Sequence, residues 1–376
     1  MQNNNTRKII SAGLICLDIT PVFRNAPVDR IDALLKPGTV VETAAADIHT
    51  GGSVANTGLA MKLLGADVVL MGKIGKDDFG AILKNQLAEY ISTEHMIEVE
   101  GENTSYSVIL APNGIDRMFL HCPGANNTFS AEDPDYGVIE GADLFHFGYP
   151  PHMRAMFRNH GDELVRMFAK VDALGVATSL DMAVVDEHAE SGGVDWTEIL
   201  KRTLPHVDFF VPSAEELAFM IDRPLYRRWE NAATGRDPTE VLKVEEIENL
   251  AETLLSWGAK IVLIKCGKRG LYVAGGEAEP LARLGDKLRI NLAGWRGVRH
   301  FEKSYRPEKV LSGTGAGDTA IAAFLYAVME GYSWKKCTQL AAAEGACCVE
   351  RYDAISGLRT LKELQERIAN GWEKQA

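Results

Sequence analysis

Residues 312–318 read Ser-Gly-Thr-Gly-Ala-Gly-Asp and run directly into an apolar stretch at residues 319–325. The glycines lack Cβ atoms, so backbone N–H groups can approach an anion closely. The apolar stretch predicts a helix, and a helix N-terminus adds partial positive charge at the same place. Asp318 would lie at the edge of this anion site, where its carboxylate can accept the proton of an attacking hydroxyl. These residue types predict phosphoryl transfer, although a glycine-rich turn with Asp318 as a helix cap would use the same residues.

A second group of small and polar residues lies near the N-terminus. Gly51 and Gly52 are followed by Asn56, and residues 72–80 read Gly-Lys-Ile-Gly-Lys-Asp-Asp-Phe-Gly. The glycine pair allows the backbone to touch a ligand. The Asn56 amide offers both donors and an acceptor to hydroxyl groups. This group therefore predicts contacts with a hydroxyl-bearing substrate.

The two groups together resemble the PfkB, or ribokinase-like, carbohydrate kinase family. That family carries GG-x3-N, LG and G-x-IG-x-D-x-x-G near its N-terminus and T-x-GAGD near its C-terminus, and the resemblance covers residue 9 to about residue 357. It implies an α/β fold, a ribokinase-like three-layer α/β/α sandwich with a mostly parallel sheet and a small β-sheet lid. It also implies a single domain over residues 1–376, lid segments near residues 20–50 and 103–123, and a homodimer formed through the lid.

The resemblance assigns a set of residues to the acceptor. An aspartate after the first strand, here Asp18, hydrogen-bonds substrate hydroxyls in the family, and a carboxylate can accept from two vicinal hydroxyls. The alternative for Asp18 is a turn-starting residue before Pro21. The acceptor-site residues implied are Asp18, Gly51, Gly52, Asn56, Thr104 and Asn126. An ordinary strand residue and a turn residue remain equal alternatives for Thr104 and Asn126, respectively.

The resemblance also implies ATP and Mg²⁺ as cofactors. Asp318 would be the catalytic base, and the amides of Gly315, Ala316 and Gly317 would stabilise the transferred phosphoryl group. Glu216 matches a family glutamate that organises Mg²⁺ through water, whereas Ser213 replaces an asparagine that lies near the ATP phosphates. A helix cap at Ser213 with Glu216 completing a capping box explains the same pair. The nucleotide-binding residues implied are Ser213, Lys265, Gly267, Lys268, Gly270 and Thr314.

Two departures from the family pattern argue against assigning a monovalent-cation site to this chain. Ser312 and Gly313 stand where relatives carry Asp-Thr, and Asp353 stands where relatives carry glycine. Asp181, at a predicted strand end, is a further weak match that could contact water or Mg²⁺ on the phosphate side.

Apolar runs that predict buried strands alternate with helical patterns along the chain. The strands are expected at residues 9–17, 68–72, 144–148, 176–181, 209–212, 261–266 and 270–274. The helices are expected at residues 54–64, 80–90, 162–174, 214–221, 244–257, 318–330 and 334–351. This alternation predicts a mostly parallel sheet with helices on both faces. Residues 223–243 and 276–310 look like insertions, and we expect both to be solvent-exposed loops.

Charge and composition exclude several classes of partner. The net charge of -12 argues against nucleic acid or an anionic membrane surface as the main partner. No apolar run approaches the roughly 18 residues of a membrane span. The six cysteines include no C-x-x-C pair, which favours small buried side chains in a reducing compartment. We therefore expect a cytoplasmic protein that acts on a small molecule.

The predicted function is MgATP-dependent transfer of the γ-phosphoryl group to a hydroxyl of an unphosphorylated sugar or sugar acid. No cation follows the glycine pair as far as Asn56, and Arg117 in the lid is expected to be solvated. A nucleoside kinase of the same family is an alternative, with Tyr106, Phe119 and Tyr149 as candidates to clamp a base. A non-catalytic sugar-binding or regulatory protein is the alternative from a different class.

Overall fold

A large, mostly parallel sheet forms the centre of the computed structural model, which describes residues 6–115, 117–234 and 237–375. Its strands run in the order β13-β12-β11-β10-β9-β8-β1-β4-β5. They are β1 (Lys8–Gly13), β4 (Asp67–Gly75), β5 (Ile97–Val99), β8 (Leu144–Gly148), β9 (Ala177–Asp181), β10 (Phe209–Phe210), β11 (Ile261–Lys265), β12 (Gly270–Gly275) and β13 (Arg299–Lys303). The strands from β11 to β5 pair in parallel, whereas β12 and β13 are antiparallel to their neighbours.

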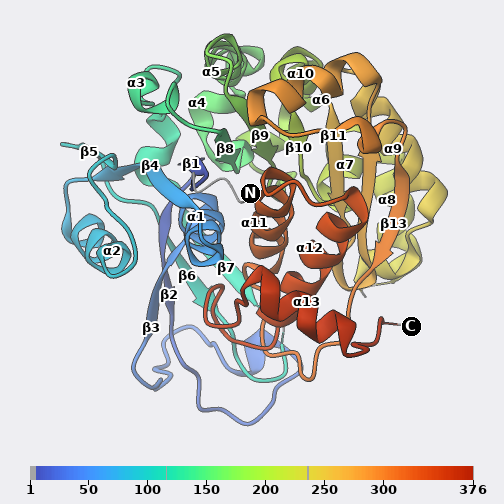
Figure 1. Ribbon diagram of the computed structural model, residues 1–376. Coiled ribbons are helices and arrows are strands. Elements are labelled where there is room, and N and C mark those ends of the chain that lie inside the picture. Colours follow the sequence, from blue (N-terminus) through green and yellow to red (C-terminus); the bar gives the residue numbers. More distant parts are fainter. Residues whose placement is uncertain (1–5, 116, 235–236, 376) are drawn as a thin grey trace.

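Helices cover both faces of this sheet because its strands are apolar on both sides. In β1, Ile9 joins one buried cluster and Ile10 joins the other. The first cluster includes α1 (Gly52–Leu64), α2 (Asp78–Ala88), α10 (Ala278–Leu288), α11 (Ala316–Met329), α12 (Trp334–Cys348) and α13 (Leu361–Ala369). The second includes α3 (Tyr136–Ile139), α4 (Arg154–Phe157), α5 (Asp162–Ala173), α6 (Trp196–Thr203), α7 (Ala214–Ile221), α8 (Arg223–Ala233) and α9 (Val244–Ser256). Figure 1 shows α1, α11 and α12 side by side in front of the sheet, so the predicted three-layer α/β/α class is confirmed.

A small sheet in the order β3-β2-β6-β7 extends from the large one, at the lower left of Figure 1. Its strands are β2 (Cys16–Thr20), β3 (Asp47–Gly51), β6 (Tyr106–Leu110) and β7 (Met118–Cys122). β2 pairs with β6 in parallel, and the two outer pairings are antiparallel. Cross-strand partners place Asp18, Ser107 and His121 in one row on the same face of this sheet.

The expected single strand at residues 9–17 is wrong, because the chain leaves the large sheet at Gly13. Gly13 has a φ of 120°, and a Cβ atom there would meet the Gly148 carbonyl oxygen at 2.4 Å. After this close approach Leu14 and Ile15 turn the chain into β2. Asp18 therefore lies within the small sheet and not at the end of a large-sheet strand.

The expectation of solvent-exposed loops at the two insertions is also wrong. Residues 223–243 contain α8 and the 3-10 turn η7 (Pro238–Val241), and Leu225 and Trp229 of α8 are buried in the second cluster. Residues 276–310 contain α10 and β13, and α10 buries Leu281 and Leu284 against the first cluster. Both insertions are thus part of the packed sandwich.

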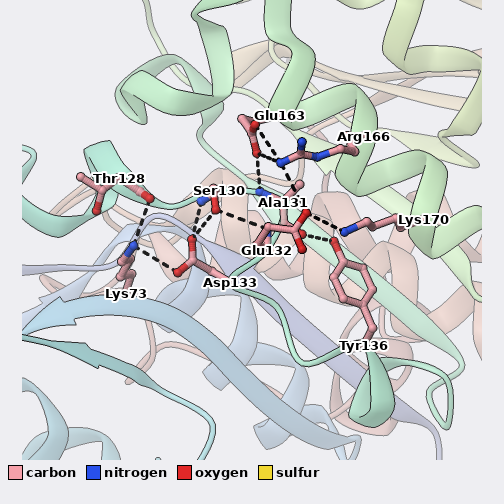
Figure 2. Close-up of polar contacts among 10 residues, drawn as sticks. All are labelled: Lys73, Thr128, Ser130, Ala131, Glu132, Asp133, Tyr136, Glu163, Arg166 and Lys170. Carbon is pink, nitrogen blue, oxygen red and sulfur yellow. Dashed lines mark hydrogen bonds and ion pairs between the residues drawn. The ribbon is translucent and has the colours of Figure 1, made fainter.

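A polar cluster anchors the segment that leaves the small sheet (Figure 2). The Lys73 ammonium on β4 lies 3.1 Å from the Asp133 carboxylate and donates to the Thr128 carbonyl at 3.0 Å. On the other side, the Ala131 N–H donates to Glu163 of α5 at 2.8 Å. These contacts fix residues 128–133 between a strand of the large sheet and a helix that covers it.

The six cysteines are free, and five of them are buried, as the sequence predicts. Within the described ranges, no helix is long and apolar enough to cross a lipid bilayer.

Candidate active site

A cleft of about 940 Å³ lies between the two sheets and the N-terminus of α11. Asp318 of α11 lines it with only 4 % of its surface exposed. Its Oδ2 accepts from Asn56 Nδ2 at 3.1 Å, and its Oδ1 accepts from the Thr57 hydroxyl at 3.1 Å. The Tyr149 hydroxyl lies 2.8 and 2.9 Å from the two carboxylate oxygens. The carboxylate is therefore fixed in place with its oxygens turned toward donors.

The glycine-rich loop delivers Asp318 through a turn that requires glycine. Gly315 precedes α11 with a φ of 73°, and a Cβ atom there would lie 2.3 Å from the Ala354 side chain. The first amides of an α-helix have no partner within the helix, so the start of this 14-residue helix can receive an anion. Thr314, Gly315, Gly317 and Asp318 all line the cleft, as an anion site beside a base requires.

The small sheet supplies the opposite wall of the cleft. Asp18 and Ser107 line it on neighbouring strands, together with His121 on β7. Burial raises the pKa of the Asp18 carboxyl, while hydrogen bonds from Cys16 and Ser107 act against this rise. A Cβ atom on Gly51 would meet the Asp18 carboxylate at 2.2 Å, so glycine at this position makes room for Asp18.

Two histidines meet at this wall. The rings of His121 and His152 lie 5.7 Å apart between centroids, and His121 Nδ1 lies 3.1 Å from the Ser107 hydroxyl. Burial lowers the pKa of His121, and burial together with the neighbouring His121 lowers that of His152 to about 4. Both rings are therefore neutral at neutral pH, when they present uncharged donors and acceptors to the cleft.

A buried ion pair lines the cleft near Glu216. The Lys265 ammonium is 2.6 Å from Asp181 Oδ1 and donates to the Val211 carbonyl at 2.8 Å. Burial opposes its charge, but the carboxylates of Asp181 and Glu216 outweigh burial and raise the pKa of Lys265. The ammonium is thus held charged at the edge of the site, beside Glu216.

Comparison with known proteins identifies the family. The model for pfkB family carbohydrate kinases matches residues 11–361. The chain belongs to this family. It is 25% identical to an uncharacterized sugar kinase of Archaeoglobus fulgidus over 80% of this chain and 98% of that protein, and 24% identical to the ribokinase of Arabidopsis thaliana over 94% of this chain and 86% of that protein.

Solved structures agree in fold. The Arabidopsis thaliana ribokinase complexed with ribose and ATP superposes with a TM-score of 0.70 at 19% identity, covering 96% of this chain and 98% of that chain. A putative ribokinase II of E. coli in complex with ATP and Mg²⁺ gives 0.67 at 20% identity over 97% and 100% of the two chains. The predicted family, ribokinase-like fold and enzyme class, an ATP-dependent carbohydrate kinase, are confirmed.

Most of the predicted catalytic and acceptor residues come together in the kinase. Gly315, Gly317, Asp318, Asp18, Gly52 and Asn56 all line the same cleft, and Asn56 donates directly to Asp318. Ala316 begins α11 and Gly51 ends β3. Thr104 and Asn126 lie beside this group and are bound to the protein itself.

Thr104 and Asn126 hold the connections between the two sheets. The Thr104 hydroxyl donates to Asp77 at 2.6 Å, and its N–H donates to the same carboxylate at 2.8 Å. The Asn126 amide donates to the Ile15 carbonyl at 2.9 Å and accepts from the Ile15 N–H at 3.2 Å. Neither side chain is among the residues that line the cleft, whereas Asn127 is.

Some of the residues predicted to bind nucleotide or metal line the cleft, and the others do not. Lys265, Thr314 and Glu216 line the cleft. Ser213 instead caps α7 in a capping box with Glu216, whose Oε2 accepts from the Ser213 N–H at 2.7 Å. The capping alternative for this pair is thus present in the structure.

The turn between β11 and β12 lies outside the lining of the cleft. Gly267 packs against Thr239, and the Lys268 ammonium pairs with Glu240, so the 223–243 insertion covers this turn. Gly270 starts β12 with a φ of 130° where a Cβ atom would meet the Glu302 carbonyl.

Sequence reasoning missed Ser107, His121 and His152 as cleft residues. The two-residue alternation of β6 was a usable signal, because it places Ser107 on one face with every second residue. Tyr149 was named only as a base clamp, and nothing local indicates its contact with Asp318, which lies 169 residues further along the chain.

Proposed function

We propose that this kinase transfers the γ-phosphoryl group of MgATP to a primary hydroxyl of an unphosphorylated sugar or sugar acid. The observation that carries the proposal is the Asp318 carboxylate, which three donors hold at the N-terminus of α11, in a cleft that Asp18 and Ser107 of the small sheet also line. Asp318 would take the proton of the attacking hydroxyl. The amides at the start of α11 would stabilise the charge on the transferred group.

The donor set near the phosphate side is compatible with Mg²⁺. Mg²⁺ binds through one or two carboxylates together with substrate phosphates and water. Glu216 and Asp181, the last residue of β9, both line the cleft. In the proposed reaction these carboxylates would hold the metal through water, and Mg²⁺ would neutralise phosphate charge. Lys265 would add its positive charge on the same side.

The basic side chains near the cleft already have partners within the protein, which supports an unphosphorylated acceptor. A second phosphate group needs a cationic clamp. Of the basic side chains described at the cleft, Lys265 is paired with Asp181 and Arg154 with Glu190 at 2.7 Å. Arg117 donates to the Ser312 hydroxyl at 3.2 Å and to Thr314, so its guanidinium is engaged by the glycine-rich loop.

A nucleoside acceptor is the second candidate, favoured by the aromatic side of the cleft. Phe119 lines the cleft with 55% of its surface exposed, on the same strand as His121. A flat base could stack on such rings. Tyr106 does not support this candidate because it packs edge-on against Phe79 at 5.3 Å. Tyr149 is bound to Asp318.

An acceptor panel tests the proposal. Purified kinase would be incubated with MgATP and free sugars, sugar acids, their monophosphates and nucleosides, and ADP formation and phosphorylated product would be measured for each. The proposal expects the highest kcat/KM with an unphosphorylated sugar or sugar acid. A preference for nucleosides would favour the second candidate. Sugar binding without product from any acceptor would instead indicate a binding protein.

A further inference from the structure

Tyr149 follows β8 with a backbone conformation that aromatic residues rarely adopt. Its φ is 71° and its ψ is 38°, in the left-handed region, and Pro150 directly follows it. This conformation is strained for a residue with a Cβ atom. The Tyr149 N–H donates to the Asp181 carbonyl at 3.3 Å. Strain of this kind persists where the surroundings enforce it, and it is a reason to look for a function.

The strained backbone places the phenol on the catalytic carboxylate. Among the described residues, only Tyr149 contacts both oxygens of Asp318, at 2.8 and 2.9 Å. The Thr57 donor is fully buried, whereas Tyr149 lines the cleft. Asn56 lines the cleft too, but it donates only to Oδ2. Tyr149 is thus the donor that lines the cleft and contacts both carboxylate oxygens, and in the proposed reaction an acceptor hydroxyl would reach Asp318 from this cleft.

The phenol acts as a donor and not as a second base. Burial, followed by the charges of Asp318 and Asp181, raises the pKa of Tyr149 well above its ordinary value. The hydroxyl therefore keeps its proton at physiological pH. It occupies Asp318 without taking part in proton abstraction.

We propose that Tyr149 guards Asp318 against water: its phenol holds the position on the carboxylate that the acceptor hydroxyl takes during transfer. The proposal rests on the proposed kinase function. An acceptor can displace the phenol because its other hydroxyl groups bind Asp18 and Asn56 at the same time. A water molecule has no such additional contacts, so it is excluded from the base while ATP is bound.

The reaction that the phenol suppresses is hydrolysis of ATP. The water oxygen would form a bond to the γ-phosphorus, the bond from that phosphorus to the bridging oxygen would break, and Asp318 would take the proton of the water. The products would be ADP and inorganic phosphate. This step needs no other reactant than MgATP and water.

The test measures phosphate release from MgATP alone, without any acceptor. Tyr149→Phe keeps the ring and removes the hydroxyl, and we expect acceptor-free hydrolysis to rise at least five-fold over the wild-type enzyme. Tyr149→Asn also removes the phenol, and asparagine tolerates the left-handed backbone, so this variant should show the same rise. Tyr326→Phe is the matched control. Tyr326 lies on α11 with its hydroxyl near Gly65, away from the cleft, and we expect no change.

A double variant tests whether the rise in acceptor-free hydrolysis depends on Asp318. Adding Asp318→Asn to Tyr149→Phe should return hydrolysis to the wild-type level or below. Thermal unfolding and MgATP binding confirm that each variant is folded. Unchanged or reduced acceptor-free hydrolysis in both folded Tyr149 variants would overturn the guard role. Failure of the kinase proposal is distinguishable, because the wild-type enzyme would then phosphorylate no acceptor in the panel.

Discussion

At the scale of single residues, the carboxylate that we propose as the catalytic base is held by its hydrogen-bond donors. Asn56, Thr57 and Tyr149 hold Asp318 at the start of α11. An amide in place of the carboxylate cannot accept a proton, so we expect Asp318→Asn to lower kcat by roughly 10²- to 10⁴-fold. Acceptor and MgATP affinities should stay within a few fold, as measured by calorimetry. Asp286→Asn on the exposed side of α10 is the control, and wild-type turnover in Asp318→Asn would remove this residue from the mechanism.

Asp18 offers a second test because it lies on the small-sheet wall of the cleft and not on the glycine-rich loop. Asp18→Ala should leave an acceptor hydroxyl unpaired, at about 1–3 kcal/mol, or roughly 5- to 150-fold in acceptor KM. The KM for MgATP should change little. Asp32→Ala, at an aspartate with 61% of its side chain exposed, controls for loss of charge in the same region. An equal rise in both KM values would contradict the placement. Asn56→Ala is less selective because Asn56 also donates to Asp318.

The sequence predicted those site residues whose partners lie next to them in the chain. Gly315 and Asp318 could be identified because the glycines, the helix and the carboxylate are consecutive. The contact of Tyr149 with Asp318 could not be predicted, since the two residues meet only after α11 packs beside the end of β8. Similarly, Thr104 matched a family position, but its hydrogen bond to Asp77 depends on where β4 ends.

At the scale of elements, the Lys73–Asp133 pair joins β4 to the segment after the small sheet (Figure 2). Both side chains are largely buried, at 9% and 15% exposure. Removing one partner leaves the other charge without compensation, so Asp133→Ala should lower the free energy of unfolding by about 3 kcal/mol. Glu100→Ala breaks the exposed pair with Lys76 and should have no measurable effect. Urea denaturation compares the two, and equal stabilities would show that the cluster does not anchor the segment.

Glu344 on α12 predicts a dependence of stability on pH. Its Oε1 accepts from the Arg359 N–H at 3.0 Å, and burial raises its pKa to about 8. The folded chain therefore keeps a proton that the unfolded chain releases at the ordinary glutamate pKa. Between these two values stability falls as pH rises, by up to about 1.4 kcal/mol per pH unit from this group.

Glu344→Gln removes this proton release. Measured by urea denaturation at pH 5.5 and 7.5, the variant should gain about 2–3 kcal/mol relative to the wild-type chain over that interval. Glu279→Gln, at a glutamate with 84% of its side chain exposed, should follow the wild-type curve. Parallel curves for the wild-type chain and Glu344→Gln would contradict the prediction.

Most strands and helices could be predicted from the sequence, and the wrong predictions have physical reasons. The apolar run at residues 9–17 gives no sign of its break, which results from the approach of Gly13 to Gly148. In the second insertion, Leu281, Leu284 and Leu288 follow a helical spacing that was available in the sequence. The loop interpretation follows instead from the family resemblance, which implies a shorter hairpin before the glycine-rich loop.

At the scale of the whole molecule, the small sheet leaves apolar surface uncovered. Its β7 is an edge strand, and an edge presents unpaired backbone groups to another chain. The exposed large apolar residues in and beside this sheet are Val22, Leu35, Val40, Phe119 and Leu120. We therefore propose a homodimer that forms through the small sheet.

Leu120→Lys tests the dimer without entering the cleft. Leu120 is 59% exposed and alternates with the cleft residues Phe119 and His121 along β7. Sedimentation velocity should show a dimer for the wild-type chain and a monomer for this variant. Leu63→Lys, at an exposed leucine of α1, should remain dimeric. A wild-type monomer at micromolar concentration, or a dimeric Leu120→Lys, would exclude this interface.

The bonds of Asn126 and Thr104 have a mechanical consequence. The Asn126 side chain forms two hydrogen bonds with the Ile15 backbone, between β1 and β2. The Thr104 hydroxyl donates to Asp77 just before β6 begins. The Ala125 N–H, just after β7, donates to the Asn103 carbonyl at 2.8 Å. The segments that connect the two sheets are thus hydrogen-bonded to one another. We infer that the small sheet would move as one unit and not strand by strand. In the proposed reaction, such a movement would bring Asp18, Ser107 and His121 toward the acceptor, or away from it, at the same time. Selectivity among sugars would then depend on the angle between the two sheets.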